Sequence, residues 1–166
     1  MSLTLAEAED RGPLTTNSRR VNLPAMFFAL ARSKVFLCGA VDESLRAEHG
    51  ISLEVFDAMT LISEWSGECD EPRLGPALAL PPDRARLLID SLLANGYASR
   101  PEPPAGAEPT FVRLTLPGTL LLSRASRTVD HELNRIIGSV LSRLDIAELS
   151  DALTMIRQRS ARFLTS

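Results

Sequence analysis

The fold of this chain is decided by residues 74–118, which read LGPALALPPDRARLLIDSLLANGYASRPEPPAGAEPTFVRLTLPG. Within them, residues 82–95 carry apolar side chains at the i, i+3, i+4, i+7 spacing of a helix with one buried face. Gly96 comes next, at the position after a helix where a positive φ is usual. The spacing therefore predicts a helix that ends at Asn95. Its predicted buried residues are Ala85, Leu88, Ile89 and Leu92.

Two strand-like runs follow this helix, and a short helix precedes it. Residues 97–100 and 111–115 are separated by the Pro- and Gly-rich loop 101–109, which is too long for a tight hairpin turn and suits a wing. The short helix, about 73–79, is expected to begin late, at Pro76, because proline inside a helix removes a hydrogen bond and crowds the preceding turn. This order of elements predicts a winged helix-turn-helix, whose second helix usually enters the DNA major groove.

Two motifs in this stretch resemble the MarR family of bacterial transcriptional regulators. Residues 88–100, LIDSLLANGYASR, are similar to the family pattern L-V-D-x-L-x-x-x-G-L-V-x-R, and residues 112–118, VRLTLPG, are similar to V-x-L-T-x-x-G. Similarity at 45–53 and 144–149 extends the resemblance over about 22–157. The resemblance implies a mainly α fold with a small β wing, in which N- and C-terminal dimerisation helices flank the winged helix-turn-helix and intertwine with a second copy.

The chain is expected to consist of an arm and one domain. Residues 1–21 are polar without periodicity, which predicts a flexible N-terminal arm. Residues 22–166 are expected to form a single MarR-like domain, because the 45% hydrophobic content of the chain suffices for one core. Its winged helix-turn-helix spans about 53–116, and its dimerisation helices span about 22–49 and 117–164.

Capping residues mark the first two helices. Asn22 is expected to cap the first helix, which carries an apolar stripe from Leu23 to Leu45 and ends at Gly50. Ser52 is expected to cap the second helix. The segment 67–72 that follows the second helix is predicted to be a loop.

The C-terminal half of the chain predicts two more helices. Thr115 is expected to cap a fifth helix whose apolar stripe continues to Val140 and Leu144. Asp145 and Glu148 have the spacing of a capping box, which predicts that the final helix spans about 146–163.

Arginines stand on both flanks of the exposed face of the predicted helix 82–95. In the functional interpretation, Arg84 and Arg86 contact base edges or phosphates, and Leu87 contacts a thymine methyl group. In the other interpretation they are ordinary solvated side chains. The predicted DNA-binding residues are Pro82, Asp83, Arg84, Arg86, Leu87, Asp90, Arg100 and Arg113.

The predicted wing departs from the family pattern. The resemblance implies Asp-Arg-Arg before the second strand, where one arginine reaches the minor groove, but this chain has Gly106, Ala107 and Glu108 there. A carboxylate at Glu108 would be repelled by phosphate. Arg100 and Arg113 are therefore the remaining cations at the base of the wing.

The charge and the ends of the chain exclude several classes of protein. A net charge of −3 argues against indiscriminate coating of nucleic acid, which depends on many cationic contacts to phosphate. The N-terminus is acidic rather than a signal peptide, and no apolar run approaches the roughly 20 residues of a membrane span. A cytoplasmic protein without a membrane partner is expected.

The remaining reactive side chains indicate neither an enzyme nor a cofactor. Cys38 is expected to be a small core residue, with a thiol switch as the alternative, and Cys69 lies in an acidic segment whose carboxylates would raise its pKa. His49 and His131 lack the spacing of metal ligands. No catalytic arrangement of nucleophile and base appears, so no enzyme activity is expected.

These observations predict a DNA-binding transcriptional regulator, and more narrowly a repressor that binds a palindromic operator as a homodimer and responds to a small, aromatic ligand. The resemblance implies a ligand pocket whose candidate residues are Phe27, Phe36, Phe56 and Trp65, although aromatic side chains at helical spacing also build ordinary cores. The second hypothesis is a degenerate winged-helix dimer that binds proteins or small molecules without recognising an operator. The missing wing arginines and the negative charge motivate it.

Overall fold

The computed structural model describes residues 22–65, 69–101 and 111–164. The predicted arm 1–21 and the wing residues Gly106, Ala107 and Glu108 lie outside these ranges. The described residues form a mainly helical structure with a small antiparallel sheet, which confirms the predicted fold class. In chain order the elements are α1 (Leu23–His49), α2 (Leu53–Glu64), β1 (Cys69–Asp70), α3 (Glu71–Leu78), α4 (Pro82–Ala94), β2 (Ala98–Ser99), β3 (Phe111–Leu114), α5 (Leu116–Ile136) and α6 (Arg143–Leu164).

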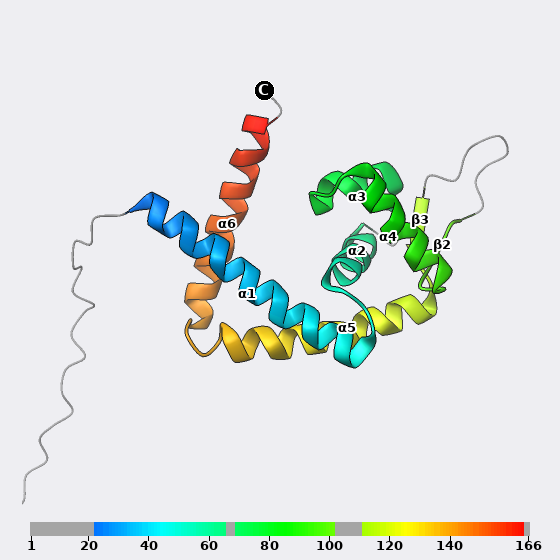
Figure 1. Ribbon diagram of the computed structural model, residues 1–166, viewed down its shortest axis with the longest axis horizontal. Helices are drawn as coiled ribbons and strands as arrows, with labels where there is room; N and C mark the ends of the chain where they lie inside the picture. Colours follow the sequence, from blue (N-terminus) through cyan, green and yellow to red (C-terminus); the bar gives the residue numbers. More distant parts are fainter. Residues whose placement is uncertain (1–21, 66–68, 102–110, 165–166) are drawn as a thin grey trace, which may run out of the picture.

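The long helices α1, α5 and α6 and the winged unit, which comprises α2, β1, α3, α4, β2 and β3, occupy different parts of the molecule. Figure 1 shows α2, α3, α4 and the strands gathered at one end of α5, whereas α6 rises from its other end. α1 packs along α5 and also contacts α2. In the sheet, β3 lies between β1 and β2, with Cys69 opposite Val112 and Ala98 opposite Leu114.

The core lies where the winged unit meets α1 and α5. α2 contacts α1, α3, α4, α5 and β3, so its buried face forms the centre of this core. Side chains from each of these elements are buried around it. The buried core residues include Val41 and Leu45 of α1, Ala58, Met59 and Ile62 of α2, Leu74 of α3, Leu88, Ile89 and Leu92 of α4, Val112 of β3, and Leu121 and Ala125 of α5.

The two halves of α1 differ in burial. Val41 and Leu45 are buried against the rest of the chain, but the N-terminal half of the helix is exposed along its predicted stripe. By length and composition alone, α1 could cross a membrane, and it is the one helix of the described ranges that meets these two criteria. This departs from the expectation that no segment would do so. The exposed apolar residues of α1 are Leu23, Met26, Phe27, Phe28, Leu30, Val35 and Phe36.

The helix ends follow the predicted caps closely. The side chain of Asn22 accepts from the backbone N–H of Ala25, that of Ser52 accepts from Val55, and that of Thr115 accepts from Gly118. Gly50, at φ 70°, ends α1 as predicted.

The end of α4 also matches the prediction. Gly96 follows the helix with a φ of 70°. Its N–H donates to Leu93 O at 3.0 Å, and the N–H of Tyr97 donates to Leu92 O at 2.9 Å. This pair of bonds is the Schellman motif, which satisfies two of the last carbonyl groups of the helix. α4 thereby turns directly into β2.

The predicted start of the third helix was wrong. α3 begins at Glu71 rather than at Pro76, and Pro76 lies inside it. In an eight-residue helix only the last four residues have an i−4 carbonyl within the helix, so Pro76 removes a single hydrogen bond. Burial of Leu74, which is fully enclosed, favours the helix in compensation. The predicted loop 67–72 was also wrong in part, because Cys69–Asp70 forms β1.

Two predictions about the C-terminal helices were also wrong. α5 ends at Ile136, so Val140, which is 79% exposed, does not continue its buried stripe, and Leu144 is exposed as well. α6 begins at Arg143 because the capping box is formed by Ser142 and Asp145. The N–H of Ser142 donates to Asp145 Oδ2 at 2.9 Å, and the N–H of Asp145 donates to Ser142 Oγ at 3.3 Å.

Gly118 should be indispensable for joining α5 to the sheet. A Cβ atom there would overlap the backbone carbonyl of Tyr97 and would lie 2.9 Å from its carbonyl carbon. We expect Gly118→Ala to lower the free energy of unfolding by about 1–3 kcal/mol, because backbone cannot yield as a flexible side chain does. Urea unfolding measures this. Ser123→Ala, at an exposed position of the same helix, is the control and should change stability by less than about 0.5 kcal/mol. Equal stabilities of the two variants would contradict the predicted clash.

Candidate nucleic-acid interface

α4 presents the face that its sequence predicts. Ala85, Leu88, Ile89 and Leu92 are buried as expected. The opposite face is exposed, and Leu87 leaves 64% of its surface in solvent. The exposed predicted DNA-binding residues of this helix are Pro82, Asp83, Arg84, Arg86, Leu87 and Asp90.

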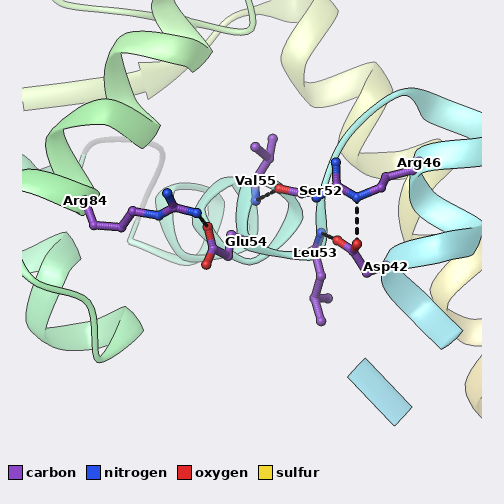
Figure 2. A network of polar contacts seen from close by, with 7 residues as sticks. All are labelled: Asp42, Arg46, Ser52, Leu53, Glu54, Val55 and Arg84. Atoms are coloured by element: carbon purple, nitrogen blue, oxygen red, sulfur yellow. Dashed lines mark hydrogen bonds and ion pairs between the residues drawn. The ribbon is translucent and has the colours of Figure 1, made fainter. Parts of the chain in front are cut away.

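Arg84 is engaged within the chain. Its Nη2 atom donates to Glu54 Oε2 of α2 at 2.8 Å. Figure 2 shows the arginine extending from α4 toward the N-terminal turn of α2. Both side chains remain about half exposed, at 59% for Arg84 and 45% for Glu54. The guanidinium is therefore both paired and accessible to solvent.

Arg100, at the end of β2, is held more firmly. Its Nε and Nη2 atoms donate to the two carboxylate oxygens of Glu71, at 2.7 and 3.3 Å, and its Nη2 atom lies 3.8 Å from Asp90 Oδ1. The hydrogen bonds to Glu71 raise the pKa of Arg100 above its ordinary value. A two-point contact of this kind fixes the plane of the guanidinium. Arg100 thus ties the sheet to α3 and α4.

Arg86 and Arg113 are the less constrained candidates. Arg86 is exposed on α4 and forms no ion pair with any residue in the described ranges. Arg113 is exposed on β3, where its Nε atom lies 3.5 Å from Ser99 Oγ. The arginines that the sequence grouped together therefore divide into an ion-paired set, Arg84 and Arg100, and an available set, Arg86 and Arg113.

A polar network joins α1 to the start of α2. Asp42 Oδ1 accepts from the backbone N–H of Leu53 at 2.7 Å, and Asp42 Oδ2 accepts from Arg46 Nε at 2.6 Å (Figure 2). The hydrogen bond from Arg46, and then that from Leu53, lower the pKa of Asp42. Asp42 was not among the residues predicted from the sequence, although its i, i+4 spacing from Arg46 is a visible signal. No comparable signal links Glu54 to Arg84.

A cavity of about 480 Å³ lies between α1, α2 and the start of α4. Its lining includes both ion pairs just described. None of the four predicted pocket aromatics lines it: Phe27 and Phe36 are exposed on α1, and Phe56 and Trp65 pack against the core. The guanidinium of Arg73 lies 4.9 Å from the centre of the Trp65 ring. The chargeable side chains that line the cavity are Cys38, Asp42, Arg46, Glu54, Asp57 and Arg84.

The two cysteines have different surroundings. Cys38 is half-buried in α1. Cys69 is buried in β1 rather than in a loop, which corrects the expectation. Burial, followed by repulsion from Asp70, raises the pKa of the Cys69 thiol to about 11. This thiol therefore stays protonated and unreactive near neutral pH. Across the described ranges, no three His, Cys, Asp or Glu side chains gather to hold a metal ion.

Comparison with known proteins identifies the fold. No protein-family model matches the sequence, and no curated protein matches it. A MarR family transcriptional regulator from Rhodococcus sp. RHA1 aligns with a TM-score of 0.72 and 20% identity, covering 82% of this chain and 96% of that one. AbsC, a MarR family regulator from Streptomyces coelicolor, aligns with 0.72 and 16%, covering 83% and 93%. CouR from Rhodococcus jostii RHA1, bound to p-coumaroyl-CoA, aligns with 0.70 and 21%, covering 79% and 90%. The chain therefore has the fold of the MarR family regulators.

Asp42 should contribute to stability through its two hydrogen bonds. We expect Asp42→Ala to lower the free energy of unfolding by about 1–2 kcal/mol, because Leu53 loses its acceptor and Arg46 loses its partner. Asp42→Asn keeps an acceptor and should lose less. Because the pKa of Asp42 is lowered by folding, the charged form stabilises above the ordinary value of 3.8, and this contribution is lost as pH falls through the lowered pKa. Urea unfolding from pH 7 down to pH 3 measures the predicted loss of stability at low pH. Equal stabilities of the Ala and Asn variants at pH 7 would contradict the predicted benefit of the retained acceptor.

Proposed function

We propose that this chain is a transcriptional regulator of the MarR family that binds double-stranded DNA through α4 and the base of the wing. The observation that carries the proposal is the exposed face of α4, where Arg86 and Leu87 stand on the second helix of a helix-turn-helix unit. A helix in this position usually enters the major groove with its N-terminal residues toward the bases. Arg113 on β3 supplies a cation at the base of the wing.

We also propose that the protein acts as a homodimer in the cytoplasm. The proposal assigns about 53–116 to the winged helix-turn-helix, and about 22–49 and 117–164 to the dimerisation helices. The apolar N-terminal half of α1 supports this, because so large an exposed surface usually marks an interface. Leu149, Leu153 and Ile156 extend apolar surface onto α6. A C2 dimer would match a palindromic operator.

Regulation by a small ligand is the finer part of the proposal. CouR shares this fold and binds p-coumaroyl-CoA. By analogy, an aromatic ligand would lower the affinity of this chain for its operator, which makes the protein a repressor relieved by that ligand. Phe27, Phe36, Phe56 and Trp65 remain the candidate pocket residues, with the first two available only where a second copy covers α1.

A specific observation favours the second candidate, a winged-helix dimer that does not recognise an operator. Arg84 and Arg100, two of the four arginines predicted to contact DNA, are already paired with carboxylates of the same chain. The net charge of −3 adds no general attraction to phosphate. DNA binding distinguishes the two candidates.

Operator binding should depend on the available arginines. The probe is duplex DNA flanking the coding sequence of this protein, titrated at several salt concentrations against random duplex of equal length. We expect selective, saturable, salt-sensitive binding, weakened about tenfold by Arg86→Ala or Arg113→Ala. Arg159→Ala on α6 removes the same charge and should leave the affinity unchanged. Identical binding to flanking and random DNA would reject operator recognition.

The dimer should depend on the apolar half of α1. Phe36, at 78% exposed, is the position to test. Phe36→Glu should convert the dimer to monomer in sedimentation-velocity experiments at micromolar concentration, because it places a charge in an apolar interface. Leu87→Glu introduces the same charge at a comparably exposed apolar side chain of α4 and should stay dimeric. A monomeric wild-type protein would contradict the proposal.

A further inference from the structure

The ion pair between Arg84 and Glu54 occupies a side chain that the proposed function assigns to DNA. Arg84 lies in the first turn of α4, where a recognition helix approaches base edges. Its guanidinium is bonded to Glu54 Oε2 at 2.8 Å (Figure 2). Arg84 also lines the cavity between α1, α2 and α4. A guanidinium in this ion pair has fewer donors free for phosphate or guanine.

Glu54 is held in place by the network at the start of α2. The backbone N–H groups on either side of it are bonded, that of Leu53 to Asp42 and that of Val55 to Ser52. Glu54 also lies in the first turn of α2, where the helix dipole favours a carboxylate. Arg84 has the longer side chain and is therefore the partner that moves.

The other charged side chains around the ion pair disfavour the approach of an added anion. Asp57 lies one turn after Glu54 on α2 and lines the same cavity, and Asp83 precedes Arg84 on α4. With Asp42 paired to Arg46, the carboxylates lining the cavity outnumber the arginines. A phosphate that approaches Arg84 therefore competes with Glu54 for the guanidinium, against repulsion from these neighbours.

We propose that Glu54 is an internal competitor for DNA, which holds Arg84 in the free protein and gives it up to phosphate or base in the complex. This inference rests on the proposed DNA-binding function. Because exposed ion pairs are weak, the competition tunes the affinity severalfold rather than blocking binding. Glu54 thereby sets how tightly α4 binds any sequence.

The test measures affinity for the flanking DNA with Glu54→Gln, which keeps the size of the side chain and removes its charge. We expect the affinity to rise about threefold to tenfold, because Arg84 no longer exchanges partners. Glu64→Gln, at the other end of α2, makes the same change in charge and should have a smaller effect. In an Arg84→Ala background, Glu54→Gln should add no more than Glu64→Gln does. Thermal unfolding of each variant verifies that it is folded.

The outcomes separate this inference from the function on which it rests. Selective binding by the wild type with unchanged or weaker binding by Glu54→Gln would overturn the competition alone. An equal gain in affinity in the Arg84→Ala background would also overturn the competition, because the gain would then come from the change in net charge and not from the release of Arg84. Absence of selective binding by both the wild type and Glu54→Gln would overturn the proposed function and the inference together. Selective binding detected only for Glu54→Gln would support the competition, with an effect larger than the severalfold change expected.

Discussion

Helix α2 packs on α1, α3, α4, α5 and β3, and the rest of the structure depends on this burial. Ala58, Met59 and Ile62 are fully enclosed, so the helix cannot shift without opening contacts to all of its neighbours. Its first backbone N–H is bonded to Asp42, which adds a polar connection to α1 at the same end. The placement of α4 relative to α1 therefore follows from α2. In the proposed dimer, a movement of the α1 helices would reach α4 through α2, and also through α5 and the sheet.

Local patterns explain why much of the fold could be predicted. The bounds of α1, α2 and α4 depend on side chains within a few positions of each end, such as the Asn22 and Ser52 caps and Gly96. β1 escaped prediction because a strand of two residues has no periodicity, and it exists through pairing with β3, which comes far later in the chain. The start of α3 was predicted wrongly for a related reason. The burial that offsets the hydrogen bond lost at Pro76 comes from tertiary packing, which the local sequence does not reveal.

In the candidate site, too, features set by local sequence could be predicted, whereas contacts between distant residues could not. Helical periodicity alone determines which side chains of α4 face outward, and that prediction was confirmed. The partners of the arginines could not be predicted, because Glu54 precedes Arg84 by 30 residues and Glu71 precedes Arg100 by 29. The aromatic spacing of α1 was ambiguous for another reason, since exposed Phe27 and Phe36 have the same periodicity whether a pocket, a second copy or solvent faces them.

The distribution of charge constrains how such a protein would recognise DNA. A net charge of −3 and two arginines paired within the chain reduce the attraction to phosphate that every sequence shares. Contacts to base edges are not reduced in the same way, because they depend on the few side chains that reach the groove. Arg86 and Leu87 are exposed for that role, and none of the carboxylates in the described part of the chain is bound to Arg86. In the proposed complex, the pairing of Arg84 and Arg100 with carboxylates would lower the affinity that every sequence shares. The ratio of specific to non-specific binding would then depend mainly on Arg86 and Leu87, and this ratio decides occupancy when one operator competes with a whole genome.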